Sequence, residues 1–184
     1  RLEAPIVVHV MTPKLFENTN SVCLAQGLSF QPGLRVETNC QNCGFQQVRI
    51  NGLDGPYTQL LLDGKALFSS LNGVYGIEQI PTGMIERVEV MRGGGSALYG
   101  ANAIGGTVNI ITKEPLNNLF MISHNLTAIG NSAYDNTTSL NTSLVNSQRD
   151  AGIYLFGTSR HRQHYDHDGD HFSEIGKLKL TTLG

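Results

Sequence analysis

The chain lacks several features that mark common classes of protein. Its 184 residues include no tryptophan and only 3 cysteines, and an odd cysteine count disfavours a disulfide-dense secreted scaffold. No run of about 18 apolar residues occurs, so no transmembrane helix is encoded. The 13 basic and 15 acidic residues leave a net charge of −2, which gives no electrostatic basis for a nucleic-acid partner. The absence of tryptophan, together with abundant glycine and the many Asn, Ser and Thr residues of the C-terminal third, favours β structure with many turns over a helical bundle.

Glycine, in contrast, is abundant, with 21 residues, and it is densest in the stretch IERVEVMRGGGSALYGANAIGGTVNIITKEP, from Ile85 to Pro115. β-Branched residues predict two strands in this stretch, one over 85–90 and one over 107–111. The glycines between them predict a bend in which the backbone takes positive φ or approaches another surface without a Cβ in the way. We expect the rest of the chain to be organised around this pair of strands.

Four charged residues lie on or beside the first of these strands: Glu86, Arg87, Glu89 and Arg92. Charges on a strand that must also pack indicate a polar enclosure, because buried charges need partners. The alternative is that these side chains are exposed to solvent on an edge strand.

Short helices and strands are expected before this stretch. Thr12, followed by proline, predicts a helix start. Ser21 can cap a second helix, which would carry Cys23 as a small buried residue. The apolar run 57–62 predicts a strand closed by an Asp-Gly turn at 63–64.

A different pattern begins after Pro115. Runs of roughly ten residues alternate between an apolar face and a face of small polar residues, with turn-rich gaps between them. The last run sets Leu178 and Leu180 against Lys177 and Lys179. Such alternation is typical of a transmembrane β-barrel wall, apolar toward lipid and polar toward a lumen. The alternative is a soluble antiparallel sheet whose apolar face covers a core.

The glycine-dense stretch strongly resembles the end of the plug domain of TonB-dependent outer-membrane receptors, as does the order VRINGL, LLLDGKAL and IEQIP before it. The stretch NCQNCGFQQVRINGL is also similar to receptors of Bacteroidetes. The resemblance implies an α+β fold with a mixed-sheet plug domain and short helices over residues 4–115. Antiparallel β-hairpins over 116–184 would be the first strands of a transmembrane β-barrel, incomplete here, whose full wall has about 22 strands.

The resemblance also implies a function. The receptor would bind a scarce metal-chelate nutrient, cobalamin or haem, at the cell surface and gate its passage across the outer membrane; iron siderophores are the next class. Energy would come from the TonB complex, which pulls on an N-terminal box that is not visible before Arg1. Residues Glu86, Arg87, Glu89 and Arg92 would form the contact between plug and barrel wall. No cofactor is required.

Outward-facing plug loops would form the ligand site in this family, and by position they are residues 39–45, 53–57 and 65–75. Aromatic side chains would supply stackable surface and polar side chains would supply hydrogen bonds. These residues are Phe45, Tyr57, Phe68 and Tyr75, and Asn42, Ser69, Ser70 and Asn72.

Cys40 and Cys43 form a CxxC pair in the first of these loops. Three interpretations are open: a local disulfide, a reduced structural pair, and half of a zinc site, for which no second Cys/His pair follows at suitable spacing. A disulfide would stiffen the loop and reduce the entropy lost on binding.

The run HRQHYDHDGDHFSE, from His161 to Glu174, is the other conspicuous stretch. Asp166, Asp168 and Asp170 at alternate positions, with Glu174 after them, partly match the oxygen-ligand spacing of a calcium loop. The glycine and the last acid depart from EF-hand positions. The resemblance places this run in an extracellular loop, and calcium in such loops is known among these receptors. Histidine-bound zinc, copper or haem iron, and a solvated loop without metal, are the alternatives.

No catalytic constellation stands out, so the sequence does not predict an enzyme. RGGGSALYG lacks the Lys-Ser/Thr of a phosphate-binding loop. Two rival functions are a stand-alone binding or signalling plug module and a secreted metal-binding protein that uses the His–Asp run. We also expect open edges on the incomplete barrel strands, which favour self-association.

Overall fold

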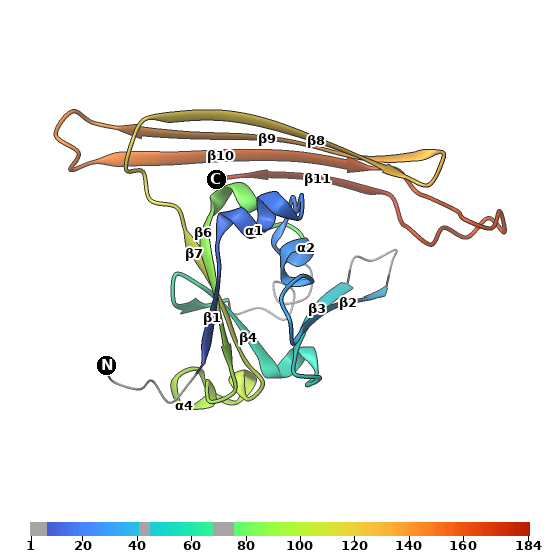
Figure 1. Cartoon of the computed structure of the whole chain (residues 1–184), viewed down its shortest axis with the longest axis horizontal. Coiled ribbons are helices and arrows are strands. Elements are labelled where there is room, and N and C mark those ends of the chain that lie inside the picture. The colour runs from blue at the N-terminus through green and yellow to red at the C-terminus, as the bar shows by residue number, and fades with distance from the viewer. Residues whose placement is uncertain (1–6, 41–44, 68–75) are drawn as a thin grey trace. The chain divides into compact units, whose positions relative to one another are not determined.

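The computed structural model describes residues 7–40, 45–67 and 76–184 (Figure 1). The chain divides into two compact units, one that ends at Thr112 and one that runs from Lys113 to Gly184. We describe each by itself. Their helices and strands are, in chain order, β1 (Val8–Met11), α1 (Pro13–Asn18), α2 (Leu24–Leu28), β2 (Leu34–Cys40), β3 (Phe45–Ile50), η1 (Gly55–Tyr57), β4 (Thr58–Leu62), β5 (Lys65–Ala66), η2 (Thr82–Met84), β6 (Ile85–Arg92), α4 (Ser96–Tyr99), η3 (Ala101–Ala103), β7 (Gly106–Thr112), β8 (Leu119–Ile129), β9 (Ala133–Val145), β10 (Gly152–Arg162) and β11 (Leu178–Leu183).

A five-stranded mixed sheet forms the centre of the first unit, in the order β1-β6-β7-β4-β5. β7 runs antiparallel to β6 and parallel to β4, and the other pairs are antiparallel. β2 and β3 form a separate two-stranded sheet. The two strands predicted around the glycine bend are therefore β6 and β7, which lie at the middle of the large sheet.

The core of this unit lies on one face of the five-stranded sheet. Alternate residues of the strands point into it, because successive side chains of a strand lie on opposite faces. Val88 of β6 and Ile110 of β7 are paired and completely buried. Phe16 of α1 and Leu28 of α2 belong to the same buried cluster, so these two helices cover this face.

The glycine bend requires glycine most clearly at Gly106. Its φ of 140° is rarely adopted by other residues, and a Cβ built there would lie 2.2 Å from the carbonyl oxygen of Met91. Gly106 pairs with Arg92 of β6 on one side and with Thr58 of β4 on the other. The residue therefore has strands on both sides and no room for a side chain.

The helix starts were predicted with mixed success. α1 begins with Pro13 in the first turn after Thr12, as expected. Ser21 does not cap α2; the N-cap position is Cys23, and the Ser21 hydroxyl instead forms a hydrogen bond of 2.7 Å with that of Thr19. Cys23 is buried, at 3% exposure, as predicted. Its backbone is extended, not helical, and it forms an isolated antiparallel β-bridge with Pro81.

The second unit is a four-stranded antiparallel sheet in the order β11-β10-β9-β8, whose long strands are visible in Figure 1. Its two faces differ in chemistry. One face carries exposed large apolar side chains from three strands: Phe120, Ile122, Leu126, Tyr134, Leu140, Leu144, Ile153 and Leu155. The other face carries small polar side chains, among them Thr137, Asn141 and Ser143 of β9. The predicted alternation is confirmed for these strands.

The last strand departs from the prediction. Leu180 of β11 pairs with Arg160 of β10, so Leu178 and Leu180 lie on the polar face and Lys179 lies on the apolar face. The alternation of Leu and Lys was correct, but its assignment to faces was wrong, because the register with β10 decides which face each residue takes.

The architecture confirms the predicted α+β fold, with short helices on a mixed sheet followed by antiparallel hairpins. No helix in the described part of the chain is long and apolar enough to cross a membrane.

Candidate functional site

The charged residues of β6 are paired within the first unit. The Arg87 Nε donates to Glu89 Oε1 at 2.8 Å, and the other carboxylate oxygen of Glu89 accepts from Asn109 Nδ2 at 3.2 Å. These side chains lie on the face of the sheet opposite Val88 and Val90, which are completely buried. Arg87 and Glu89 are 44% and 29% exposed, so the pair is open to solvent on this side.

Glu86 and Arg92 lie apart from this pair. Glu86 is exposed. Arg92 donates from Nη2 to the carbonyl oxygen of Pro32 and covers Gly33, whose Cβ, if present, would lie 2.9 Å from the guanidinium carbon. The four charges therefore do not form one cluster. β6 is not an edge strand, because it lies between β1 and β7, but Glu86 is exposed and the Arg87–Glu89 pair is partly exposed, in keeping with the solvent-exposed alternative.

Most of the predicted ligand residues fall outside the described residues or have side chains that the structure does not describe: Asn42, Phe45, Phe68, Ser69, Ser70, Asn72 and Tyr75. Cys40 and Cys43 likewise carry no described side chain. Tyr57 is described and is 45% exposed. It lies just before the first residue of β4, whereas Lys65 pairs with Leu62 at the far end of that strand. Tyr57 and Lys65, which belong to two of the predicted ligand loops, therefore lie at opposite ends of β4.

A polar connection that the sequence did not reveal joins the β4–β5 turn to β7. Asp63 accepts hydrogen bonds from the backbone N–H of Thr112 at 2.9 Å and from its hydroxyl at 2.8 Å. The N–H of Gly64 donates to Asn109 Oδ1 at 2.9 Å. The Asp-Gly pair signalled a turn, but nothing in the sequence indicated its partners.

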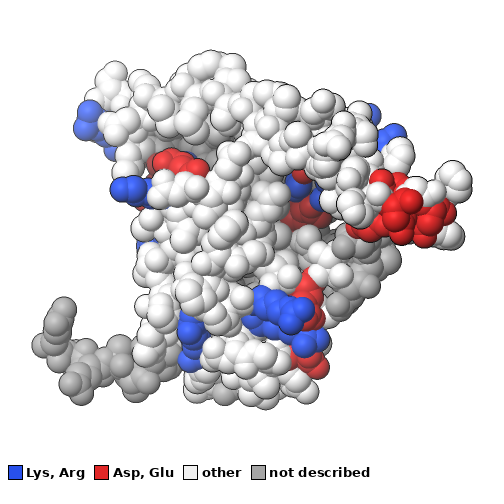
Figure 2. Space-filling view, turned by 45° about the vertical axis from the view of Figure 1, so that its right-hand side comes forward, with Lys and Arg blue, Asp and Glu red and all other residues white. Residues whose placement is uncertain are grey.

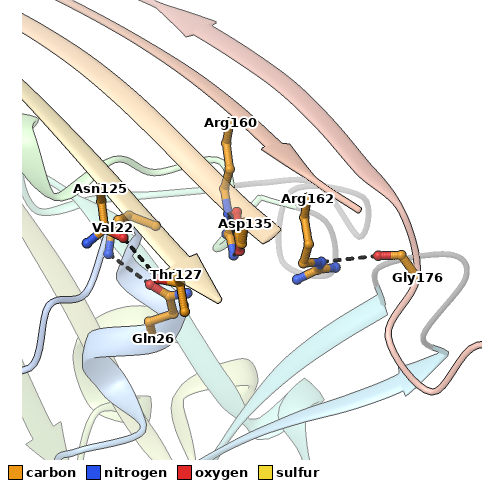
Figure 3. Close-up of polar contacts among 8 residues, drawn as sticks. All are labelled: Val22, Gln26, Asn125, Thr127, Asp135, Arg160, Arg162 and Gly176. Carbon is orange, nitrogen blue, oxygen red and sulfur yellow. Dashed lines mark hydrogen bonds and ion pairs between the residues drawn. The ribbon is translucent and has the colours of Figure 1, made fainter. Parts of the chain in front are cut away.

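The polar face of the second unit holds a buried ion pair. Arg160 of β10 donates to both carboxylate oxygens of Asp135 on β9, with the shortest distance 2.6 Å (Figure 3). Arg160 is 3% exposed and Asp135 is 12% exposed. Arg162 donates to the carbonyl oxygen of Gly176 at 3.1 Å, which fastens the start of the long β10–β11 connection (Figure 3).

The His–Asp run forms part of this β10–β11 connection and gathers acidic atoms, which Figure 2 shows on a protruding surface. Asp166, Asp168 and Glu174 bring carboxylate oxygens within 4.8 Å of one another. Asp170, predicted to belong to the same set, instead caps the N–H of Phe172 at 2.8 Å. Three converging carboxylates can supply the oxygen ligands that calcium prefers.

Neighbouring contacts hold this connection in place. The Tyr165 and Ile175 backbones bond to each other in both directions, at 2.9 and 3.2 Å. The Glu174 carboxylate accepts from the N–H of His167 at 2.7 Å, and the Asp166 carboxylate accepts from the N–H of Gly169 at 2.7 Å. These bonds bring Glu174 back beside Asp166, which explains why residues eight apart in the chain meet.

The fold and its strand order define a plug domain of the TonB-dependent receptors. The model of the family described as TonB-dependent Receptor Plug Domain matches residues 1–107, more than half of the chain, and the chain belongs to this family. The predicted family is confirmed.

Among individual relatives, the vitamin B12 transporter BtuB of Vibrio vulnificus is 36% identical over 105 residues, which cover 57% of this chain and 17% of the transporter. The solved siderophore receptor PirA of Acinetobacter baumannii is similar with a TM-score of 0.72 and 26% identity, over 89% of this chain and 26% of that receptor. A mutant ferric enterobactin receptor of Pseudomonas aeruginosa, solved with enterobactin, is similar with a TM-score of 0.69 and 26% identity. That likeness covers 93% of this chain and 27% of the receptor. This chain thus spans only 17% of the length of the curated relatives that it matches.

Both structural likenesses extend over nearly the whole chain, so they include the second unit as well as the plug. They confirm the predicted fold, a mixed-sheet plug followed by the antiparallel hairpins of an outer-membrane receptor.

Proposed function

We propose that this chain is the plug and the adjoining first strands of a TonB-dependent active transporter that binds cobalamin or haem at the cell surface and gates its passage across the outer membrane. The observation that carries the nutrient class is the 36% identity of the plug portion to a vitamin B12 transporter. The structural likeness to receptors of siderophores makes an iron siderophore the second candidate.

We place the apolar face of the second unit against lipid and its polar face toward the lumen. Eight large apolar side chains stand exposed on one side of β8, β9 and β10. These strands have 11, 13 and 11 residues, enough to span a hydrocarbon core, since a tilted strand needs about 9–11 residues. In water such a surface would be an aggregation hazard, whereas in a membrane it needs no further cover.

In the assembled receptor, we expect Glu86, Arg87, Glu89 and Arg92 to lie near the barrel wall, with the TonB complex as the energy source. Arg87 and Glu89 already satisfy each other, so contact with the wall does not require them to be buried unpaired. Glu86 is exposed, so among these four residues it is the one whose charge we expect a partner on the barrel wall to stabilise most.

We also assign calcium, bound by Asp166, Asp168 and Glu174, to the β10–β11 connection. The convergence of three carboxylates supports this assignment, because like charges so close are stabilised by a cation. The short β8–β9 turn lies at the same end of the sheet, and we place this end outside the cell.

The proposed nutrient is tested by calorimetric titration of the full-length receptor with cyanocobalamin, haemin and ferric enterobactin in parallel. We expect cyanocobalamin or haemin to bind with the highest affinity. Binding of ferric enterobactin alone would replace the proposed cargo by a siderophore. Absence of binding by all three would refute the metal-chelate class.

A further inference from the structure

The turn between β4 and β5 consists of Asp63 and Gly64, with φ of 48° and 75°. Two consecutive residues with positive φ form the turn type whose twist matches antiparallel strands, and Asp-Gly is a preferred pair for it. The backbone conformation accounts for the turn without using the Asp63 carboxylate. The side chain is therefore available for another contact.

The Asp63 carboxylate bonds to the end of β7, where β4 no longer provides a partner. β4 pairs with β7 only as far as Ile110, so Thr112 at the end of β7 has no β4 residue beside it. The two oxygens of Asp63 accept from the N–H and the hydroxyl of Thr112, and the Asp63 N–H donates to the Ile110 carbonyl at 2.8 Å. Asp63 thus continues the hydrogen bonding of β4 to β7 beyond the last strand pair.

Asn109 extends the connection to β6. Its Oδ1 accepts from the Gly64 N–H, and its Nδ2 donates to Glu89, which in turn holds Arg87. The amide group of Asn109 therefore connects the β4–β5 turn, on one side of β7, to Glu89 of β6 on the other side. Thr112 is also the last residue of the first unit, so these bonds are made where the chain leaves the plug.

The bonds to Thr112 and to the Gly64 N–H are exposed. Water can replace an exposed hydrogen bond when it opens, so its free energy of opening is small, and hydrogen bonds of this kind are found in the parts of proteins that move. The β6–β7 ladder beside these bonds carries Val88 and Ile110, which are completely buried, so opening the ladder would expose apolar surface and cost more than opening the exposed bonds.

We propose that Asp63 and Asn109 form a releasable clamp that holds the exit of the plug in its resting conformation, and that opening of this clamp is an early local step when the plug rearranges during transport. The proposal rests on the proposed transport function. It goes beyond that function by naming the contact that restrains the plug and the residues that release it.

The test is hydrogen–deuterium exchange of the full-length receptor, followed by mass spectrometry of the peptide that covers Asn109 to Thr112. Asp63→Gly removes the carboxylate and keeps a residue that tolerates positive φ. Loss of two hydrogen bonds to a charged group should raise exchange of this peptide by about tenfold or more. Asp63→Asn, which keeps an oxygen acceptor for the Thr112 N–H, should restore most of the protection.

Asn51→Gly is the matched control, because Asn51 has φ of 52° in the turn Asn51–Gly52 and lies outside the clamp. Equal exchange of the Asn109–Thr112 peptide in Asp63→Gly and Asn51→Gly would overturn the clamp. Uptake of radiolabelled cyanocobalamin and haemin supplies the second readout: Asp63→Gly should keep the wild-type Kd and raise the uptake rate at saturation. Faster exchange with unchanged or slower uptake would overturn the role in transport. If the wild-type receptor takes up neither nutrient, the proposed function fails, while the exchange data still decide whether the clamp exists.

Discussion

Replacing Gly106 by alanine should weaken the plug sheet at its centre. The added Cβ would lie 2.2 Å from the Met91 carbonyl oxygen and 3.0 Å from Ile50 Cδ1. Carbon and oxygen approach to about 3.3 Å in the closest ordinary contacts, so β6 and β7 would have to separate locally by about 1 Å. Both strands are held by partners on their other edges, which limits this movement.

Two costs add at this position. Forcing an extra methyl group into a packed region costs about 1–3 kcal/mol. A residue other than glycine at the φ of 140° adds a strain of order 1–3 kcal/mol. We therefore expect Gly106→Ala to lower the free energy of unfolding of the sheet by about 2–6 kcal/mol.

The matched control is Gly93→Ala, in the same glycine-dense stretch. Gly93 has φ of 66°, and a Cβ built there meets nothing within 4 Å. Only the backbone term remains, at about 1–2 kcal/mol. Native-state hydrogen exchange of the β6 and β7 amides measures both variants, and equal losses of protection would refute the steric argument.

Four further outcomes are expected. Arg160→Met should destabilise the receptor by about 3–5 kcal/mol in thermal or urea unfolding, because it leaves the buried Asp135 carboxylate without its partner. Adding Asp135→Asn should recover part of this loss of stability, and no recovery would mean that the two residues are not coupled. Leu140→Lys, on the apolar face, should impair assembly into outer membranes by about 2–4 kcal/mol, whereas Thr127→Lys on the polar face should be tolerated; equal effects would argue against lipid on the apolar side. In calorimetric titration with calcium chloride, Asp168→Ala should abolish binding and Asp170→Ala should retain it, and the assignment is wrong if both bind like wild type. Because β8 and β11 are the edges of an open sheet, the 184-residue chain in isolation should self-associate, and strictly monomeric light scattering would contradict this.

The alternation after Pro115 was sufficient to predict two-faced strands, because a strand repeats every two residues and each of β8, β9 and β10 presents one apolar side. It was not sufficient for β11. Leu178 and Leu180 took the polar face because pairing with β10 sets the register, and a shift of one residue exchanges the two faces.

The sequence by itself determined the family, the two strands around the glycine bend and the need for glycine between them. Those features depend on local backbone conformation and on a long specific motif. Only the tertiary structure decided what the charges and turns contact. Asp63 meets Thr112 across 49 residues and Gly64 meets Asn109 across 45, so no local pattern records either pair. The same holds for Asp170, which lies in an acidic run but caps its own turn, while Glu174 joins Asp166 and Asp168 because the chain folds back between Tyr165 and Ile175.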